Sequence, residues 1–470
     1  MYTLYSLLLA MAALLSLPWW ALQMLRLGKY RAGFAERIGR VPSRILQAAG
    51  GTQEGTIWIH AVSVGEVLAV GPLVGQLRKA NPARPVFVST TTATGQRLAR
   101  QRFGETQVFF MPLDFGFALR PYFKALDPAL LILAETEFWP NLLHTARKRG
   151  TRVAIVNARI SDRSFPRYRR FRWFFSRVLS NADLLLTQTQ DDARRLKEIG
   201  ASEERVRVSG NLKFDIQLSV EGPLVGKLRS ATSAGAPVIV CGSTTEGEEE
   251  ILLAAFRAVF QQFPRATMVL APRHPERFDK VAQIISSAGI TMFRRSSWKA
   301  DAPLDGSVFL LDSLGELASV YALATLAFVG GSLLPGVGGH NILEPAQHGV
   351  PVLTGPHTEN FREIVRIFTS NPAGNAAQGE AVVGRDADRI SGAPGLCLVT
   401  ADNVGTEFLR LLKDHEECAR LGRRAKELFQ QNTGATARTM QALQPFFNEK
   451  KLVGGKPDGA KPDGREKGLQ

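Results

Sequence analysis

A single carboxylate follows the first strongly apolar run of the chain. The segment "IWIHAVSVGEV" covers residues 57–67 and ends in small residues around Glu66. Ser63 lies three positions before Glu66, and this Ser-x-x-Glu spacing is typical of a capping box at a helix start. A carboxylate at the end of a strand can also act as a general base toward a substrate hydroxyl. These residues alone favour the cap, so the choice depends on the rest of the chain.

Other ionisable groups in the amino-terminal half stand at expected strand ends. The segment "LAETEFWPN" (133–141) brings Glu135 and Glu137 to the end of one strand. Because alternate residues of a strand point to the same side, we expect both carboxylates to share one face. The segment "SGNLKFD" (209–215) brings Lys213 to the end of the last strand expected in this half.

Glycine-rich strand ends in the carboxy-terminal half could bind a phosphate. They are "IVCGSTTEGEEE" (239–250) and "FVGGSLLPGVGGHNILEPAQHG" (328–349). Glycine lets backbone approach a ligand closely, and a helix start offers N–H groups to an anion. Ordinary turns are the alternative, since neither segment is a P-loop or a dinucleotide fingerprint in its proper place. Glu344 could accept hydrogen bonds from ribose hydroxyls, or could merely be favoured by the helix dipole.

Two more strand ends in this half could contact a nucleotide. In "LAPRHPERF" (270–278), Arg273 could clamp a phosphate through two parallel N–H bonds, whereas His274 is better interpreted as positional. In "LLDSLGEL" (310–317), the turn Leu314-Gly315-Glu316 could read a nucleobase edge with its backbone groups. An ordinary helix start explains this turn equally well.

The composition indicates a globular protein without a disulfide framework or a metal site. Its 470 residues, 45% hydrophobic and 21% charged, allow roughly two to three domains. The three cysteines, Cys241, Cys397 and Cys418, are widely spaced, which favours a reducing compartment. Asp386-Ala-Asp388 has the spacing of an acidic metal motif but lies in a poorly patterned region, so we expect no metal.

The first 25 residues carry no charged side chain. As a helix they would reach about 37 Å, enough to cross a bilayer core. Basic residues follow at once, which by the positive-inside tendency keeps the body in the cytoplasm: Arg26, Lys29, Arg31, Arg37 and Arg40. A helix lying in one leaflet is the alternative. A cleaved signal peptide is disfavoured because no Lys or Arg precedes the apolar run.

The positive charge of the chain predicts an acidic partner. The formal net charge is +15. The segment "RSFPRYRRFRWFFSR" (163–177) interleaves arginines with aromatic residues and contains no acid. Such interleaving can bind single-stranded nucleic acid. Beside an apolar anchor we favour an anionic membrane surface or a phosphorylated lipid, and expect no nucleic acid.

Alternating strand-like and helical stretches predict an α/β chain with two doubly wound parallel sheets. Strand pattern lapses at 215–236, where Gly, Pro and Ser gather. We therefore divide the chain into an anchor (1–25), a first Rossmann-like domain (26–215), a linker (216–236), a second Rossmann-like domain (237–448) and a disordered basic tail (449–470). Two such sheets predict a ligand cleft lined by the carboxyl ends of strands.

Eight segments, taken in order, resemble the 3-deoxy-D-manno-octulosonic acid (Kdo) transferases of lipopolysaccharide synthesis. They are "HAVSVGE", "ETEFWPN", "NARISDRS", "GNLKFD", "GSTTEGEEE", "PRHPERF", "GGHNILEP" and "GPHTENF". The resemblance implies the two-domain GT-B fold without metal or other cofactor. It implies transfer of Kdo from CMP-Kdo to the lipid A precursor on the cytoplasmic face of the bacterial inner membrane. One departure is a slightly longer loop, "LLPGVGG", before the Gly-Gly-His-Asn motif.

The resemblance also implies a role for each matching residue. Glu66 becomes the general base, and Glu135 with Lys213 stabilises the transition state. CMP is contacted by Pro272, Arg273, Leu314, Gly315, Glu316, Asn341, Ile342, Leu343 and Glu344. A helix start lowers the pKa of a carboxyl and burial raises it, and the sequence leaves that balance open for Glu66.

Two rival interpretations differ in function. One is a UDP-sugar transferase or epimerase of the same fold, and the other is a membrane-tethered lipid-binding protein with a vestigial nucleotide cleft.

Overall fold

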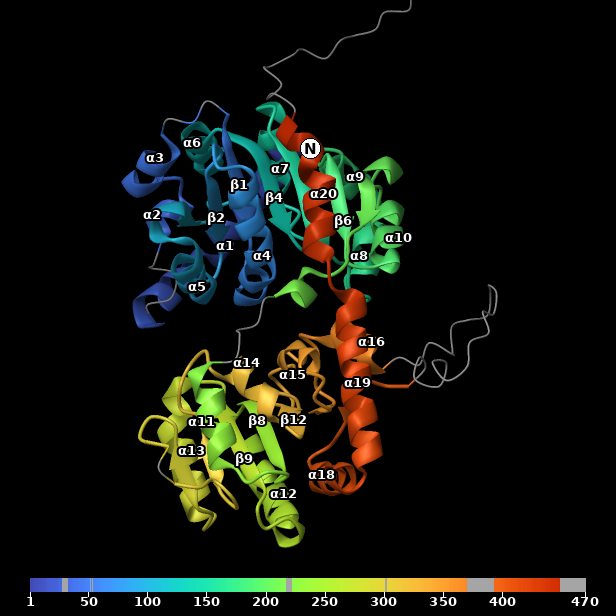
Figure 1. The fold of residues 1–470 in the computed structure, drawn as a ribbon. Helices are drawn as coiled ribbons and strands as arrows, with labels where there is room; N and C mark the ends of the chain where they lie inside the picture. Colours follow the sequence, from blue (N-terminus) through green and yellow to red (C-terminus); the bar gives the residue numbers. More distant parts are fainter. Residues whose placement is uncertain are drawn as a thin grey trace, which may run out of the picture. The chain divides into compact units, whose positions relative to one another are not determined.

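The computed structural model describes residues 1–27, 33–50, 52, 54–216, 222–300, 302–369 and 393–448. These residues form two compact units (Figure 1). The first unit holds the described residues up to Ile216 and from Thr433 onward, and the second holds those from Gln217 to Asn432. Lys29, Arg31, Asp386, Asp388 and the tail 449–470 lie outside the described residues.

The first unit is built on a parallel sheet of seven strands in the order β3-β2-β1-β4-β5-β6-β7. The strands are β1 (Thr56–His60), β2 (Val86–Thr90), β3 (Val108–Phe110), β4 (Pro128–Ala134), β5 (Arg152–Ala158), β6 (Leu184–Thr187) and β7 (Val206–Val208). Most of these strand residues are buried, as expected for a parallel sheet covered on both faces. The strand order reverses between β1 and β4, which is the topological switch point of this sheet.

Two apolar cores cover the two faces of this sheet. In β1, Trp58 belongs to one core and its neighbours Ile57 and Ile59 to the other, because alternate strand residues point to opposite faces. The first core includes residues of α3 (Ser43–Ala49), α6 (Gly116–Leu126), α7 (Pro140–Lys148), α9 (Arg172–Leu179) and α10 (Gln190–Glu198). The second includes residues of α4 (Val64–Ala80), α5 (Ala93–Phe103) and α20 (Ala435–Asn448). The unit also contains α1 (Tyr2–Leu27), α2 (Phe34–Arg37) and α8 (Phe165–Arg170).

The chain returns to the first unit through α20. This helix packs on α4, β5 and the 3-10 turn η3 (Leu212–Asp215), and its Leu443 is fully buried. At its start, the Gly434 N–H donates to the Asp215 carboxylate at 2.6 Å, and the Arg438 Nε donates to the Ser209 carbonyl at 2.7 Å. Residues 433–448 therefore pack with the first unit, whereas the sequence analysis placed them in the second domain. The reason is that Leu443 and Ala435 complete the apolar core beneath α4.

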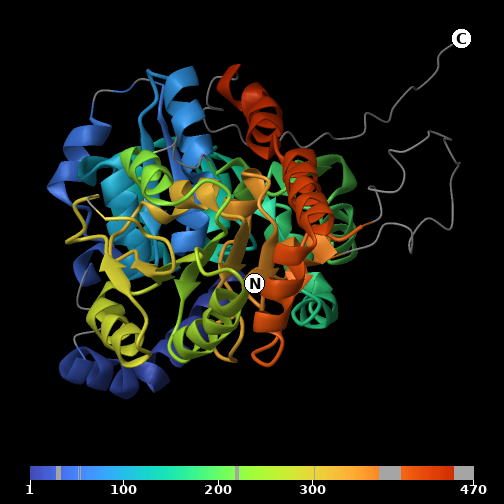
Figure 2. The ribbon, with the colours of Figure 1, turned by 60° about the horizontal axis from the view of Figure 1, so that its bottom comes forward.

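The second unit repeats the architecture with the strand order β10-β11-β9-β8-β12-β13-β14, all parallel. Its strands are β8 (Val238–Thr244), β9 (Thr267–Pro272), β10 (Met292–Arg294), β11 (Val308–Leu310), β12 (Leu326–Val329), β13 (Val352–Thr354) and β14 (Cys397–Leu398). Its helices are α11 (Pro223–Ala231), α12 (Glu248–Gln262), α13 (Phe278–Ser287), α14 (Leu317–Val320), α15 (Leu343–Gln347), α16 (Arg362–Thr369), α18 (Val404–Lys413) and α19 (His415–Asn432). Figure 2 gives a second view. The strand order reverses between β8 and β12, so the predicted fold of two doubly wound sheets is confirmed.

Candidate active site

Glu66 and Glu135 lie at the switch point of the first sheet. Glu66 follows β1 and Glu135 follows β4, and these two strands are paired neighbours. In open α/β sheets, ligands bind at the carboxyl ends of the strands where the strand order reverses. The topology therefore brings together two carboxylates that are 69 positions apart in the sequence.

Glu66 is both a helix cap and a perturbed carboxyl group. Its Oε1 accepts a hydrogen bond from the Ser63 hydroxyl at 2.9 Å, and its Oε2 accepts one from the Val62 N–H at 2.8 Å. Burial, followed by the negative charge of Glu135, nevertheless raises the pKa of Glu66 to about 7. The side chain is only 8% exposed, so desolvation outweighs the two hydrogen bonds that favour the ionised form. The capping and catalytic interpretations of this residue are therefore compatible.

Glu135 forms an ion pair with Lys213. The Lys213 Nζ lies 3.2 Å from the Glu135 Oε1, and both side chains are largely screened from solvent. Glu135 has a φ of +57°, an uncommon conformation for a residue other than glycine, and its N–H donates to the Val156 carbonyl at 2.8 Å. Because β4 ends at Ala134, the strand alternation expected for Glu135 and Glu137 does not apply here. Their charges still both raise the pKa of Glu66, so both carboxylates lie near it.

Asn157 positions the turn that carries Lys213, a role that the sequence analysis missed. This buried residue has a φ of +55°, and its Oδ1 accepts from the Leu212 N–H at 3.0 Å. Its carbonyl accepts from the Gln188 Nε2 at 3.1 Å. The Asn211 Oδ1 in turn accepts from the Lys213 N–H at 3.0 Å. The available signal was an asparagine directly after an apolar strand run, since asparagine tolerates left-handed backbone better than most residues.

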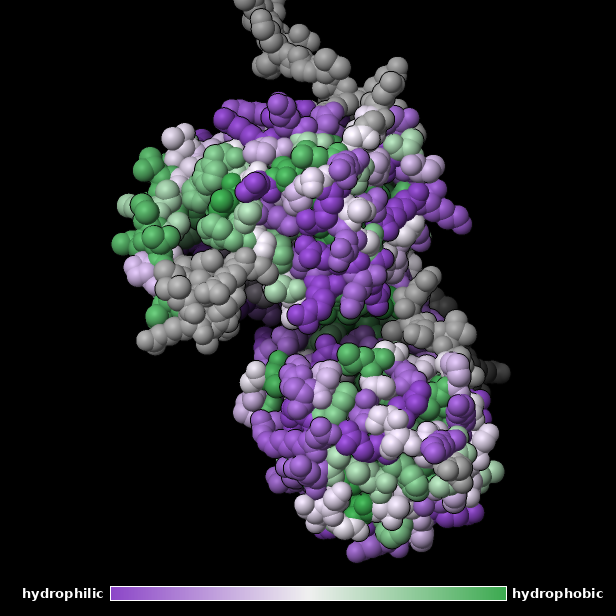
Figure 3. Space-filling view, turned by 90° about the vertical axis from the view of Figure 1, so that its left-hand side faces the viewer, coloured by the Kyte–Doolittle hydropathy of each residue, from purple (hydrophilic) through white to green (hydrophobic). Residues whose placement is uncertain are grey.

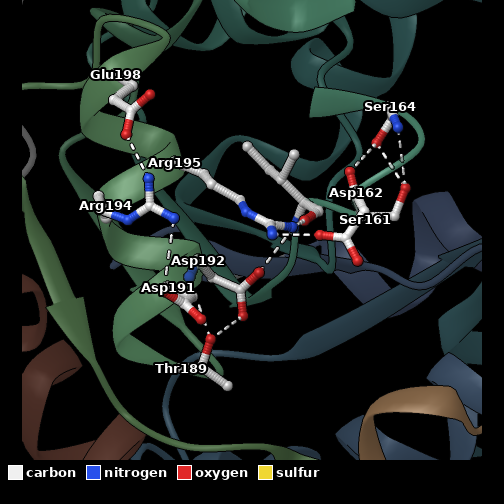
Figure 4. Close-up of polar contacts among 10 residues, drawn as sticks. Ser161, Asp162, Ser164, Thr189, Asp191, Asp192, Arg194, Arg195 and Glu198 are labelled. Carbon is white, nitrogen blue, oxygen red and sulfur yellow. Dashed lines mark hydrogen bonds and ion pairs between the residues drawn. The ribbon is translucent and has the colours of Figure 1, made fainter. Parts of the chain in front are cut away.

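The loop that follows β5 is held in place by α10 (Figure 4). The Asp192 Oδ1 accepts from the Ile160 N–H at 2.9 Å, and its Oδ2 accepts from the Thr189 hydroxyl at 2.6 Å. Arg195 donates to the Ile160 carbonyl at 2.5 Å and also pairs with Asp162. These bonds fix the backbone that leads into α8, the first helix of the arginine–aromatic segment.

The arginine–aromatic segment packs beside the loop that carries Glu135 and Glu137. Phe138 from that loop lies 5.8 Å from the ring of Tyr168 and 6.1 Å from the ring of Phe175. Tyr168 and Phe175 thus contact the body of the unit, whereas Phe171 and Trp173 are exposed. The arginines of the segment are also exposed to solvent: Arg163, Arg167, Arg169, Arg170, Arg172 and Arg177.

Three of the residues predicted to contact CMP lie after β9 and at the start of α15 in the second unit. Arg273 directly follows β9, and its N–H donates to the Thr244 carbonyl at 2.9 Å. Asn341 donates from Nδ2 to the Glu344 Oε1 at 3.4 Å, and its Oδ1 accepts from the Leu343 N–H at 3.2 Å. Burial raises the pKa of Glu344, whereas the Asn341 bond and then the positive charge of Arg273 lower it. Arg273, Asn341 and Glu344 therefore form one polar cluster.

The other residues predicted to contact CMP can offer mainly backbone groups to the nucleotide. Pro272, Ile342 and Leu343 have buried side chains. Gly315 has a φ of +85°, which residues other than glycine rarely adopt. Leu314 beside it is exposed. The Glu316 carboxylate is bound by Arg295 through two bonds of 3.0 Å, so it stabilises its own turn.

Glu248 occupies N–H groups of a loop that, from its sequence, could bind a phosphate or form an ordinary turn. Its carboxylate accepts from the N–H groups of Gly331, Ser332 and Leu333 at 2.7, 2.9 and 2.9 Å. It is completely buried and also accepts two bonds from Thr245, at 2.9 and 3.0 Å. A Cβ on Gly330 would lie 2.7 Å from the Glu248 Oε2, so glycine is needed there for the close approach. The first part of the glycine-rich loop is therefore organised around an internal anion, and a phosphate must use other groups.

Metal-binding side chains do not cluster in the part of the chain that the structure describes. None of the described residues forms a group of three or more His, Cys, Asp or Glu side chains that could hold a metal ion.

Among the described residues, one helix, over Tyr2–Trp19, is long and apolar enough to cross a membrane by its length and composition alone.

Comparisons with known proteins show which family this chain is similar to. Residues 32–216 match the family described as 3-Deoxy-D-manno-octulosonic-acid transferase (kdotransferase). The chain is 35% identical to a 3-deoxy-D-manno-octulosonic acid transferase of Haemophilus influenzae over 89% of this chain and 92% of that protein. It is 33% identical to one of Bordetella pertussis over 89% and 93%.

A solved structure supports the fold alone. The crystal structure of UDP-N-acetylglucosamine 2-epimerase matches with a TM-score of 0.53 at 14% identity, over 86% of this chain and 100% of that one. The predicted GT-B fold and the predicted family are thus both confirmed. The chain belongs to the 3-deoxy-D-manno-octulosonic acid transferases, a family of glycosyltransferases.

Proposed function

We propose that the protein is an inverting, metal-independent transferase that moves Kdo from CMP-Kdo to a hydroxyl of the lipid A precursor. The observation that carries this proposal is the buried Glu66, whose pKa is raised to about 7 beside the ion pair of Glu135 and Lys213. A general base works best when its pKa lies near the working pH. A carboxylate that only caps a helix does not require a raised pKa.

The first unit supplies the base and its electrostatic surroundings. Ionised Glu66 takes the proton of the acceptor hydroxyl while the acceptor oxygen forms a bond to the anomeric carbon of Kdo. The bond from that carbon to the phosphate oxygen breaks, and CMP leaves with the electron pair. The transition state carries positive charge at the anomeric carbon, as in glycoside cleavage. The Glu135 carboxylate stabilises this charge, and the ion pair with the Lys213 ammonium holds Glu135 in position.

The second unit binds CMP. Arg273 meets the phosphate, Glu344 accepts from ribose hydroxyls, and Asn341 orients Glu344 through the bond at 3.4 Å. Backbone groups of Pro272, Ile342, Leu343 and the turn Leu314-Gly315-Glu316 complete the contacts. No step in this scheme requires a metal, because Arg273 and backbone groups balance the charge of the leaving phosphate.

The acceptor is held by the first unit at a membrane. The exposed arginines of α8 and α9 pair with phosphates of the lipid A precursor, close to Glu66 and Glu135. The apolar α1 attaches the protein to the cytoplasmic face of the bacterial inner membrane.

Incubation of the full-length protein with CMP-Kdo and tetraacylated lipid A precursor, followed by mass spectrometry, tests donor and acceptor together. We expect product ions heavier by Kdo, and protection of the protein against thermal unfolding by CMP but not by UDP. Turnover of a UDP-sugar, with protection by UDP, would instead support the epimerase-like alternative. Binding of the lipid without any product would support the lipid-binding alternative.

A further inference from the structure

We propose that α1 does not cross the membrane but lies along one leaflet, with both of its ends on the side of the first unit. This inference rests on the proposed membrane attachment and adds its topology. A helix that crosses a bilayer separates its two ends by the hydrocarbon core, which is about 30 Å thick. The contacts of the first two turns of α1 exclude that separation.

The amino-terminal end of α1 is bound to the catalytic unit by polar side chains. The Asn181 Nδ2 donates to the Tyr2 hydroxyl at 2.7 Å, and the Tyr2 ring stacks on His144 with 3.9 Å between the ring centroids. The Asn141 Nδ2 donates to the Ser6 hydroxyl at 3.0 Å. Asn141 and His144 belong to α7, and Asn181 follows α9. Crossing the bilayer would carry Tyr2 and Ser6 away from all of these partners.

Two further contacts strengthen this attachment. The Tyr5 hydroxyl is hydrogen-bonded to the buried Asp114 carboxylate, and the Tyr5 ring lies 6.2 Å from that of Phe174 in α9. Met1 packs against the apolar core of the first unit. The start of the helix is thus part of the folded unit.

The other end of α1 must also stay close to the first unit. Only five residues separate Leu27 from Gly33, and they can span at most about 20 Å. Gly33 packs so closely on Phe110 that an added Cβ would lie 1.9 Å from the phenylalanine ring. Both ends of α1 therefore remain on the side of the catalytic unit.

The first ten residues of α1 divide into a docked face and a free apolar face. Tyr2, Tyr5 and Ser6 are half-buried against the body. The free face begins with Leu4, Leu7 and Leu8, and from Met11 to Trp19 the helix is exposed around most of its circumference. The large apolar side chains of this exposed part are 51 to 82% exposed: Leu4, Leu7, Leu8, Met11, Leu14, Leu15, Leu17 and Trp19. Figure 3 shows apolar side chains gathered along one edge of the first unit. Such a face is buried when the helix lies in the boundary between headgroups and acyl chains.

A basic cavity beside the helix places its docked face at the level of lipid phosphates. The cavity has a volume of about 390 Å³ and lies between the start of α1 and helices α6 and α7. Tyr2, Thr3 and Ser6 line it together with Arg120, Lys148 and Arg149, and its lining contains no carboxylate. Anionic headgroups are attracted to such clusters of positive charge. The free face of α1 then enters the acyl chains of that same leaflet.

Labelling of single cysteines in membrane vesicles tests this topology. The reporter is Thr3→Cys, an exposed position, and the matched control is Ser202→Cys, an exposed position on the body of the first unit. Both are made with Cys241, Cys397 and Cys418 replaced by alanine, and are treated with a membrane-impermeant maleimide. We expect both to be labelled in inverted vesicles, Thr3→Cys more slowly because it lines the cavity at the headgroup level, and neither in sealed right-side-out vesicles. Labelling of Thr3→Cys only in right-side-out vesicles, with the control labelled only in inverted ones, would overturn the proposal.

A second measurement uses the unaltered chain. An impermeant amine reagent, followed by mass spectrometry, should modify the α-amino group of Met1 in inverted vesicles; modification from the opposite side would contradict the inference. Recovery of the protein in the soluble fraction would refute the membrane attachment itself, together with its topology. A spanning helix would refute only the topology and leave the transferase function intact.

Discussion

The Lys213 ammonium lies 3.2 Å from the Glu135 carboxylate, and the charge of Glu135 raises the pKa of Glu66. Lys213 follows the last strand of the first sheet, whereas the two carboxylates follow its central strands. Glu135 thus belongs to the ion pair and is also, after burial, a cause of the raised pKa of the proposed base. The protonation state of Glu66 therefore depends on residues far away in the sequence.

The rate of transfer should depend on pH through Glu66. Because its pKa is raised to about 7, the ionised base is the minor form below that pH, and kcat/KM should rise with pH and level off above about 7. The same group should make the protein less stable as the pH rises from about 4.5 to 7, since the folded state binds the proton more tightly than the unfolded chain does. A pH–rate profile and thermal melts across this range measure both effects. A flat rate profile between pH 5.5 and 8 would contradict the assignment.

Replacing Glu135 by glutamine should move that profile. Removal of the negative charge lowers the pKa of Glu66, so the acidic limb should shift to lower pH while the maximal rate falls. The shift separates an electrostatic role from a purely structural one, which would lower the rate without moving the limb. The matched control is Glu105→Gln, an exposed carboxylate in the same unit, which should leave the limb in place.

Asn157 should act through Lys213. Asn157→Gly keeps the left-handed backbone available but removes the hydrogen bond to the Leu212 N–H, so we expect a lower kcat with a folded protein. In a double-mutant cycle with Lys213→Ala, the two effects should not add, because the first change displaces the group that the second removes. Steady-state kinetics of the four proteins measure the coupling. Independent, additive losses would show that Asn157 does not position Lys213.

Glu248→Gln should destabilise the second unit and weaken CMP binding. The amide supplies only one acceptor oxygen to a set of five donors, and each buried donor left without a partner costs about 1–3 kcal/mol. Glu250 on the same helix is exposed, so Glu250→Gln is the matched control and should behave like the unaltered protein. Calorimetric titration with CMP and thermal melts compare the two variants. Equal melting and equal CMP affinity would refute the role of Glu248.

The sequence predicted the fold well because both sheets are parallel and buried. Runs such as "ALLILA" mark strands, and the alternation with helices indicates two doubly wound sheets. The destination of α20 could not be predicted, because its local pattern says that it is amphipathic but not which core it completes. The Ser63–Glu66 cap was readable from spacing alone, whereas the raised pKa of Glu66 arises from burial and from Glu135, which only the fold brings close.

The glycine-rich loop of the second unit shows what a sequence motif cannot distinguish. The glycines at 330 and 331 allowed either a phosphate loop or an ordinary turn, since close approach to any anion requires the same residue types. The anion that meets these N–H groups is Glu248, a side chain of the chain itself. A local pattern can thus indicate that an anion is bound without telling a ligand from a buried carboxylate.

The most direct test of the mechanism is the activity of Glu66→Gln with CMP-Kdo and lipid A precursor, measured together with CMP binding. The amide keeps the size of the side chain and an acceptor for the Val62 N–H but cannot take a proton. We expect a loss of turnover of about 10²–10⁴-fold with CMP affinity unchanged. Ser63→Ala, which removes the cap but keeps the carboxylate, should retain most of its rate and lose about 1 kcal/mol of stability. Turnover in Glu66→Gln equal to that of the unaltered protein would contradict the account.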